Sequence, residues 1–497
     1  MFGAVAWCAS CRHQAEASPA SPPRNASTTI AVEPRPLADS TLYDELFDDA
    51  LPHEFVIELS QEEWEGVTQD MLEYAEAHPV TPYYDGDGRP YRTDNFREAN
   101  LIYRRPDGTE IKLTQVGFRS RGNESRRLPV KDGKFYKSHF KVKFNETFGL
   151  AKDDPAREHL RQRRFAGMKA LNFKWSRHND WDPYANLSKI NELFSYALLR
   201  RIGVSTPRMS MATLQLRIEG TEVNYGLYGI IEPVDDEFLE RRYASAAGDL
   251  YKCLYLGAGP HLTEESLSGD HVGIKDPDRN YRPIYDLKTN ERESDHSALR
   301  EFVRGINALE GQPFVDYVEA GFEVDRFIRY LAMGIYINNL DDYRFLANNY
   351  YLYFEPAGKT DFIPYDFDIS LGTGWHGEMG YDEFINQDVF HTKSVPTLWH
   401  DDSARPLVDK ILSVEEYRAR YVQYLKDYIK PENRLFLYSE YRAKYEQVHA
   451  LYGNETANDT ADPDPMGLAG YEKKYFCDKT KSVLDQLGLG YSGYEVE

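Results

Sequence analysis

Acidic and amide side chains gather in residues 338–372, NNLDDYRFLANNYYLYFEPAGKTDFIPYDFDISLG. The segments YYLYF and DFIPY are rich in aromatic and β-branched residues, and the Pro-Ala-Gly-Lys between them favours a turn, so together they predict a β-hairpin. Asp341 and Asn349 precede the first strand and Asp366 follows the second, which brings all three to one end of the hairpin. Carboxylate and amide oxygens are ligands that suit Mg²⁺, an ion that binds together with phosphate. The alternative is a surface hairpin with solvated acids.

The order of these polar groups is that of protein kinases, where an aspartate base precedes an asparagine ligand and a hairpin leads to a metal-binding aspartate. In that arrangement Asp341 is the base, and Asn349 and Asp366 hold the metal ion. The interval from Asp341 to Asn349 is longer than in an ordinary kinase catalytic loop, so the chain is not a standard protein kinase. Asp368 is a second choice of metal ligand, and Asp342 a second choice of base. Substitution of Asp342 is expected to change phosphoryl transfer and ATP affinity little, because neighbours on a chain point in different directions.

The segments NLDDYRFLANNYYLY and FIPYDFDISLG resemble the signature of the CotH-type kinases, a family of spore-coat and secreted proteins with an atypical kinase-like fold. Further matching segments are GFRSRGNESR at 117–126, KSHFKVKFNETFG at 137–149, the stretch 171–208 from LNFKW to RRIGVSTPR, YGLYGIIEPVDDEFLERRY at 225–243, GDLYKC at 248–253 and YDLKTNE at 285–291. The resemblance implies phosphoryl transfer from ATP to a protein substrate with Mg²⁺ or Mn²⁺. It also implies a secreted or cell-surface location.

The strands before residue 150 carry the cations expected to bind phosphate. In SHFKVKF, Phe140, Val142 and Phe144 alternate with Lys141 and Lys143, which predicts a strand with one apolar and one basic face. A strand lysine contacts the phosphates in kinases, so Lys141 and Lys143 are both candidates, and the pattern does not choose between them. Two solvated lysines at a strand edge are the competing interpretation.

The loop RSRGNES places a glycine among polar residues, and its amides together with Arg121 are expected over the phosphates. The helix predicted in NLSKINELFSYALLRRIG carries Glu192 beside its apolar stripe, which makes Glu192 the candidate partner of the strand lysine. After an apolar strand, Ile-Ile-Glu-Pro resembles a kinase hinge, so Glu232 and Val234 are expected against the nucleotide. The alternatives are a solvated Glu192 and a buried, structural Glu232.

Composition limits the class of protein. The 497 residues are 41% hydrophobic, with 37 Tyr and 25 Phe, which is enough apolar material for a core. The net charge of −22 disfavours nucleic-acid binding, because phosphate backbones are bound by basic surfaces. The sequence contains no window of 18 apolar residues, so it predicts no transmembrane segment.

The N-terminal segment predicts a leader. Residues 1–10 are mildly apolar and are followed by a Pro/Ser/Ala-rich linker, so residues 1–40 are interpreted as a leader and linker, with lipoprotein processing at Cys11 as one route. A disordered N-terminus without processing is the alternative. Cys8 and Cys11 form a C-x-x-C, but no second pair completes a zinc site.

The fold class expected is α+β, with the bilobal arrangement of an atypical protein kinase. Residues 41–235 are predicted to form an antiparallel, β-rich small lobe, and residues 236–497 a mainly helical large lobe. Two other activities remain open on the sequence: a noncatalytic surface, structural or adhesin-like protein, and nucleotidyl transfer to protein from the same ATP–metal site.

Overall fold

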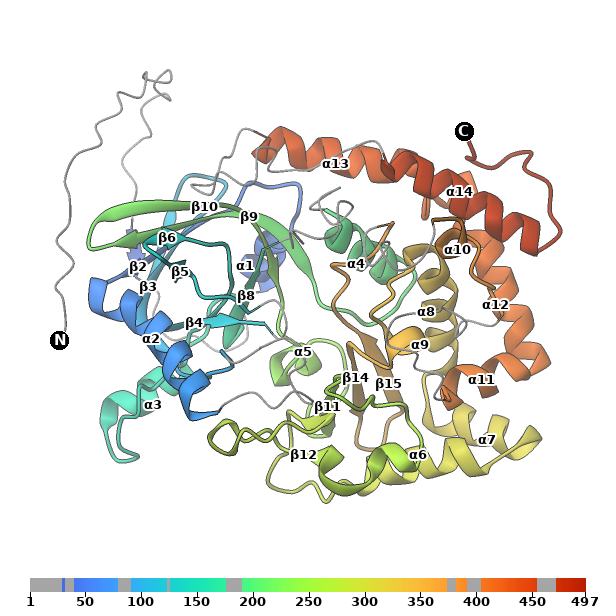
Figure 1. Cartoon of the computed structure of the whole chain (residues 1–497), viewed down its shortest axis with the longest axis horizontal. Helices are drawn as coiled ribbons and strands as arrows, with labels where there is room; N and C mark the ends of the chain where they lie inside the picture. Colours follow the sequence, from blue (N-terminus) through green and yellow to red (C-terminus); the bar gives the residue numbers. More distant parts are fainter. Residues whose placement is uncertain are drawn as a thin grey trace.

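Seven strands in the N-terminal half of the chain close into a barrel (Figure 1). The computed structural model describes residues 29–31, 40–78, 91–122, 126–175, 190–372, 381–390, 404–453 and 471–497. Around the barrel the order is β4-β3-β2-β9-β10-β8-β7, and β7 pairs with β4 to complete the ring. The strands are β2 Glu54–Leu59, β3 Arg97–Arg104, β4 Glu110–Arg121, β7 His139–Lys143, β8 Ala170–Lys174, β9 Met209–Ile218 and β10 Thr221–Ile231. Neighbouring strands of the ring are antiparallel except β2 and β9, which are parallel.

Alternation along these strands places apolar side chains inside the barrel and polar ones outside. Phe140 and Val142 of β7 lie in the interior with Phe173 of β8, so Lys141 and Lys143 point outward. The helix α2, Gln61–Ala77, contributes Trp64, Val67 and Met71 to the same core. Ser60 caps this helix by accepting a hydrogen bond from the Glu63 N–H at 3.1 Å. Smaller elements of this half are β1 Thr29–Ala31, α1 Ser40–Leu46, β5 Val130–Lys131, β6 Lys134–Phe135 and α3 Pro155–Gln162.

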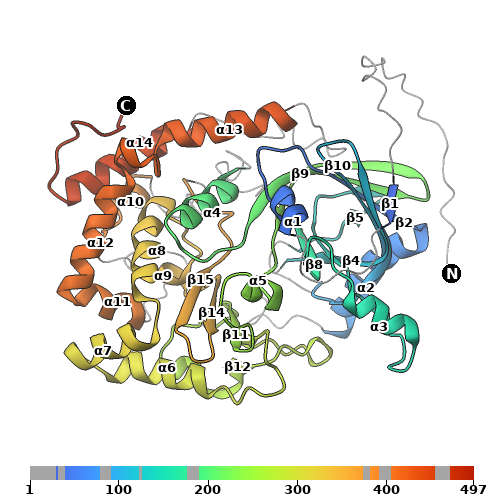
Figure 2. The same cartoon turned by 180° about the vertical axis from the view of Figure 1, so that it is seen from behind.

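A second sheet lies between the barrel and the helices of the C-terminal half (Figures 1 and 2). Its order is β12-β13-β11-β14-β15, with β11 Asp249–Cys253, β12 Val272–Gly273, β13 Tyr285–Leu287, β14 Tyr350–Phe354 and β15 Thr360–Pro364. The predicted hairpin is confirmed, since β14 and β15 pair antiparallel from Tyr350↔Pro364 to Phe354↔Thr360. One face of the sheet belongs to the large helical core. The other face, with Tyr351 and Tyr365, packs on Val234 and Phe238.

The C-terminal half is mainly helical, and its helix α8, Val324–Ile337, is mostly buried. The others are α5 Asp236–Glu240, α6 Ser297–Ala308, α7 Gly311–Gly321, α9 Tyr343–Leu346, α10 Tyr381–Ile385, α11 Pro406–Ser413, α12 Glu415–Tyr428, α13 Tyr438–Tyr452 and α14 Tyr471–Gln486. The helix α4, Asn191–Arg201, precedes β9 in sequence but packs in this helical core. Helix α8 packs against α4, α12 and α14. Within the described ranges, no helix is long and apolar enough to cross a membrane.

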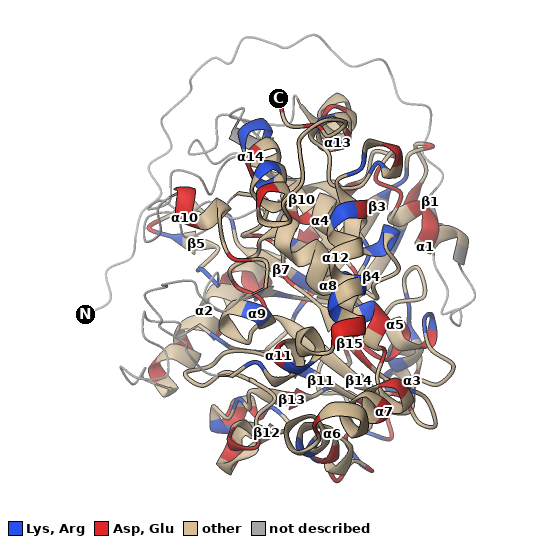
Figure 3. Ribbon diagram, turned by 90° about the vertical axis from the view of Figure 1, so that its right-hand side faces the viewer, with Lys and Arg blue, Asp and Glu red and all other residues tan. Residues whose placement is uncertain are grey.

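The structure is therefore mixed α and β, as predicted, with closure of the N-terminal sheet into a barrel as a feature that the sequence patterns did not indicate. Lysine and arginine residues are interspersed with acidic ones over both halves of the ribbon (Figure 3). Residues 1–28 and 32–39 of the predicted leader and linker lie outside the described residues, as do Cys8 and Cys11.

The long helix α13 links the two halves of the molecule (Figure 1). At its C-terminal end, the Tyr452 hydroxyl accepts a hydrogen bond from the His53 N–H at 2.8 Å and donates one to the Met211 carbonyl at 2.9 Å. At its N-terminal half, the Tyr441 hydroxyl donates to the Asn191 side chain at 2.6 Å. Helix α13 follows the predicted division at residue 235 in the sequence, but it contacts the barrel and α4, which both precede that division.

Replacing Tyr452 with Phe is expected to lower the free energy of unfolding by about 1–3 kcal/mol, because it leaves a buried N–H and a buried carbonyl without a partner. Chemical denaturation measures this change. Tyr491→Phe is the matched control, since Tyr491 is 41% exposed. Equal stability of the two variants would contradict a bracing role for Tyr452.

Candidate active site

A single buried lysine joins three carboxylates from distant parts of the chain. Lys174, the last residue of β8, lies 3.0 Å from Glu192 of α4 and 3.3 Å from Asp368, and it also forms an ion pair with Asp366. Its side chain is only 6% exposed. Burial lowers the pKa of Lys174, but Asp366, Asp368 and Glu192 together raise it well above its ordinary value. The amine therefore remains charged and ties the barrel to α4 and to the end of the hairpin.

Glu192 lies in the first turn of α4 and is almost wholly buried. Burial and the neighbouring Asp366 and Asp368 raise the pKa of Glu192, while Lys174 lowers it. The same carboxylate accepts a hydrogen bond from the Phe367 N–H at 3.3 Å. Glu192 is thus partner to a strand lysine, as the sequence predicted, but that lysine is Lys174.

Asp366 follows β15 in a left-handed backbone conformation, with φ +64°. Its N–H donates to the Tyr196 hydroxyl at 3.0 Å, and its carbonyl accepts from the Asn339 side chain at 2.8 Å. Burial raises the pKa of Asp366, but Lys174, Arg121 and Lys252 outweigh burial and lower it to about 2. The carboxylate is therefore ionised and surrounded by positive charge, in a backbone conformation that non-glycine residues adopt only when their surroundings hold them there.

Asp341 is held by the two asparagines that precede β14. The Asn348 side chain donates to one carboxylate oxygen at 2.6 Å and the Asn349 side chain to the other at 2.8 Å. Burial raises the pKa of Asp341 to about 7; Asp366 and Asp368 add to the rise, and the two amides oppose it. A carboxylate with this pKa exchanges a proton readily near neutral pH, which is the property required of a general base.

Asp342 has a structural role that the sequence analysis did not predict. Its side chain caps α9 by accepting from the Arg344 N–H at 2.9 Å, and it also binds the Arg344 guanidinium at 2.8 Å. The Tyr330 hydroxyl donates to it at 3.1 Å, and both members of the ion pair are buried. Asp341 and Asp342 are therefore separated by environment: the first faces Asn348 and Asn349, and the second faces the helical core.

Lys141 and Lys143 lie on the outer face of the barrel that also carries Lys174. Lys141 is opposite Asn172 in the β7–β8 register, two residues from Lys174, and it lines a pocket of about 760 Å³. Burial and Arg119 lower the pKa of Lys141 to about 7. Lys143 forms an ion pair with Glu146 at 2.8 Å and lies over the Phe96 ring. Within the described part of the chain, neither lysine forms an ion pair with Glu192 or Asp366.

Two further cations approach Asp366. Arg121, at the end of β4, donates to the Tyr365 hydroxyl at 3.2 Å. Lys252 of β11 lies 5.4 Å from the centre of the Tyr365 ring, and burial, Arg121 and Lys288 lower its pKa to about 8. Arg121 was predicted from the sequence, whereas Lys252 was not. Residues 123–125 of the polar loop after Arg121 lie outside the described residues.

The predicted hinge runs beside this site. The Glu232 carboxylate binds Arg242 at 2.6 Å and the Tyr43 hydroxyl at 2.7 Å, and it accepts from the Arg208 N–H at 3.1 Å. These contacts account for a buried Glu232 on structural grounds alone. Val234 is buried with Tyr351 and Tyr365 against the second sheet, close to the residues that flank Asp366. Nucleotide contact by either residue stays a prediction.

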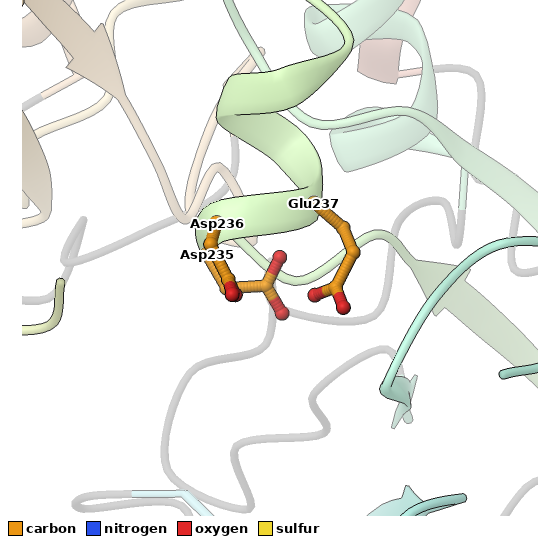
Figure 4. A group of neighbouring side chains, drawn as sticks. All are labelled: Asp235, Asp236 and Glu237. Carbon is orange, nitrogen blue, oxygen red and sulfur yellow. The ribbon is translucent and has the colours of Figure 1, made fainter. Parts of the chain in front are cut away.

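Three acidic side chains gather just after the hinge, at the start of α5 (Figure 4). Asp235 caps this short helix by accepting from the Phe238 N–H. Lys169 forms ion pairs with Asp236 and Glu237, and Arg164 binds Glu237 at 2.6 Å. Because basic partners already neutralise much of the charge, this cluster is explained as a structural ion-pair network around α5.

The comparisons identify the family. The sequence model of the CotH kinase protein family matches residues 118–474, well over half of the chain. The chain belongs to this family. A curated CotH relative, the inner spore coat protein H of Bacillus subtilis (strain 168), is 23% identical over 247 residues. That alignment covers 49% of this chain and 59% of the relative, so the chain spans less than two thirds of the relative's length.

In this CotH protein, the lysine that sequence reasoning missed is in the segment LNFKW. The segment begins the stretch 171–208 that resembles the family, and the helix predicted to carry Glu192 follows it in that stretch. A lysine at the end of the strand just before that helix was the available signal. The alternating pattern of SHFKVKF drew attention to Lys141 and Lys143 instead, because alternation reveals which face a lysine occupies but not which acid it meets.

Asp342→Ala is expected to destabilise the fold by about 3–5 kcal/mol, because it leaves the buried guanidinium of Arg344 without its carboxylate. Asp341→Ala is the matched neighbouring variant and removes only hydrogen bonds from two amides. Urea unfolding of both variants checks this difference. An Asp342→Ala protein as stable as the parent would show that the Arg344 pair does not support the core.

Proposed function

We propose that this CotH protein is an ATP- and metal-dependent protein kinase that transfers the γ-phosphate to a hydroxyl group of a protein substrate. The observation that supports this most is the contact of Lys174 with both Glu192 and Asp366. Kinases use such a strand lysine and helix glutamate together with a metal-binding aspartate at the end of a hairpin. Residues 41–235 then act as the small lobe and 236–497 as the large lobe of a kinase-like bilobal fold.

The donor groups suit the metal ion that the family description implies. Asp366 offers an ionised carboxylate, and Asp368 contacts the same Lys174 ammonium. Asn349 directs its NH₂ group at Asp341, and its amide oxygen accepts no hydrogen bond within the described residues. These are oxygen ligands of the kind that Mg²⁺ and Mn²⁺ take. A bound ion supplies positive charge to the phosphate oxygens of ATP.

The residues around this site divide the transfer step among them. The hydroxyl oxygen of the acceptor forms a bond to the γ-phosphorus, the bond from that phosphorus to the bridging oxygen breaks, and ADP leaves with the electron pair. Asp341 orients the hydroxyl and receives its proton, which its raised pKa permits. Lys174 and Arg121 offset negative charge on the phosphates. Asn348 and Asn349 hold the Asp341 carboxylate in place.

The location proposed for the protein is the cell surface or a spore coat, after export. Support comes from the relative, which is named as an inner spore coat protein. The candidate leader and Cys11 lie outside the described residues, so this location rests on the relative and on the sequence pattern.

Separate reactions with γ-labelled and α-labelled ATP test the proposed activity. The parent protein with Mg²⁺ or Mn²⁺ is expected to label protein from the γ-position only. Asp341→Ala should keep ATP binding and lose about 10²–10⁴-fold in transfer rate, because it removes a positioned base. Asp366→Ala should lose the thermal stabilisation that ATP gives together with the metal. Label from the α-position would indicate nucleotidyl transfer, and label from neither would favour a binding protein.

The choice of lysine gives an independent prediction. Lys174→Met should abolish metal-dependent ATP binding and transfer, because Glu192 and Asp366 lose their common partner. Lys143→Met is the matched control on the same barrel face, since Lys143 pairs with Glu146 instead. Thermal shift with ATP and metal, followed by γ-phosphate transfer, distinguishes the two. If Lys143→Met loses ATP binding while Lys174→Met remains functional, the phosphate contact belongs to β7 and the assignment to Lys174 of β8 is wrong.

A further inference from the structure

The cations around Asp366 differ in how far their charge is already neutralised. Lys174 contacts Glu192, Asp366 and Asp368, so protein carboxylates already neutralise its charge. The Arg121 guanidinium donates a hydrogen bond to the neutral hydroxyl of Tyr365. The Lys252 side chain makes no hydrogen bond or ion pair within the part of the chain that the structure describes, and its ammonium lies over the Tyr365 ring. Positive charge without a carboxylate partner in a half-buried position favours binding of an anion.

The strand register fixes where Lys252 lies. In the second sheet Lys252 is opposite Tyr351 of β14, which is two residues beyond Asn349. Tyr351 contacts Tyr365 edge to face, and Tyr365 immediately precedes Asp366. Lys252 therefore rises from the same sheet that carries Asp341, Asn349 and Asp366, whereas Lys174 and Arg121 come from the barrel on the other side.

The segment that follows β11 is also tied to the base. The Tyr255 N–H donates to the Asn348 side-chain oxygen at 2.8 Å, and the Asn348 amide donates to Asp341 at 2.6 Å. The chain three residues beyond Lys252 is therefore joined to Asp341 through Asn348.

The segment between Asp341 and Asn349 does not supply this charge itself. Its single basic residue is Arg344, which is fully buried and paired with Asp342. The Arg344 guanidinium packs close to Gly334 of α8 and lies over the Phe345 ring, inside the helical core. A cation for the transferred group must therefore come from another element.

We infer that Lys252 binds the terminal phosphoryl group of ATP and stabilises its negative charge during transfer. The inference rests on the proposed function. In the transfer step, the three outer oxygens of the phosphoryl group carry charge while the bond to the acceptor oxygen forms and the bond to ADP breaks. The Lys252 ammonium gives a hydrogen bond to one of these oxygens, and no proton changes place between Lys252 and the substrate.

Nucleotide binding without turnover tests the assignment. The parent is expected to bind ATP with Mg²⁺ more tightly than ADP with Mg²⁺, because only ATP has the terminal phosphoryl group. Lys252→Met should weaken ATP binding about tenfold, the scale of one hydrogen bond between charged groups, and leave ADP binding unchanged. Lys252→Arg should retain most of the preference for ATP, since it keeps the charge. Isothermal titration at one pH and salt concentration gives all of these affinities.

Lys359→Met is the matched control. Lys359 lies in the turn at the opposite end of the β14–β15 hairpin, so the same chemical change there should alter neither affinity. The thermal midpoint of each nucleotide-free variant shows whether the fold is retained. The rate of γ-phosphate transfer at saturating ATP should fall about 10²–10³-fold in Lys252→Met, as for removal of one charge-stabilising donor.

Three results separate the possible failures. If Lys252→Met binds ATP as the parent does, or loses ATP and ADP affinity equally, Lys252 does not bind the terminal phosphoryl group. If Lys252→Met binds normally but Lys252→Arg does not, packing in β11 governs the site and the assignment is again overturned. If the parent itself binds neither nucleotide with metal, the proposed kinase function fails before the role of Lys252 is reached.

Discussion

The site depends on one buried ammonium group. Lys174 brings together the end of β8, the first turn of α4 and the segment after β15, which are far apart in the sequence. Transferring a charge out of water is unfavourable unless partners of opposite charge surround it. Three carboxylates provide this compensation for Lys174, and each of them is in turn held by its own element. The position of the barrel relative to the second sheet is therefore coupled to the ionisation of the same residues that are proposed to bind nucleotide and metal.

The backbone around these residues is held in unusual conformations by buried hydrogen bonds. Asn338, Asn349 and Asp366 all have positive φ angles. Asn339 connects Asp366 with Asp341, because its side chain donates to the Asp366 carbonyl at 2.8 Å and accepts from the Asp341 N–H at 3.0 Å. Left-handed backbone at asparagine or aspartate is tolerated better than at most residues but still requires support from surrounding structure. The hairpin end is therefore shaped before any ligand binds.

The C-terminal helices supply part of this support. Tyr441 of α13 donates to Asn191, which precedes Glu192, and Asn191 itself donates to the Ser370 carbonyl at 3.1 Å. In α14, the Tyr475 hydroxyl donates to the Tyr336 carbonyl of α8 at 2.6 Å. Helix α13 thus contacts α4, which carries Glu192, and α14 contacts α8, which leads to Asp341. Although the family match ends at residue 474, the structure explains why these helices are part of the same folding unit.

Local sequence patterns determined the elements of this protein and several of its polar groups. Alternation of apolar residues predicted β7, and aromatic and β-branched composition around a turn predicted the hairpin β14–β15. The order of polar residues along the chain marked Asp341, Asn349 and Asp366 as neighbours. These signals are local, because periodicity and turn chemistry depend on residues a few positions apart. The resemblance to the CotH family, which the family model supports, also came from the sequence.

Tertiary structure alone decided which charges meet. Lys141, Lys143 and Lys174 all point from the same barrel face, and only the packing of α4 selects Lys174 as the partner of Glu192. Likewise, Asp341 and Asp342 are adjacent in sequence, yet one is held by asparagines and the other is buried against Arg344. Barrel closure through β4 and β7 and the position of Lys252 beside Tyr365 belong to the same category. Such pairings depend on distances between elements many residues apart, and a linear pattern of residue types contains no information about those distances.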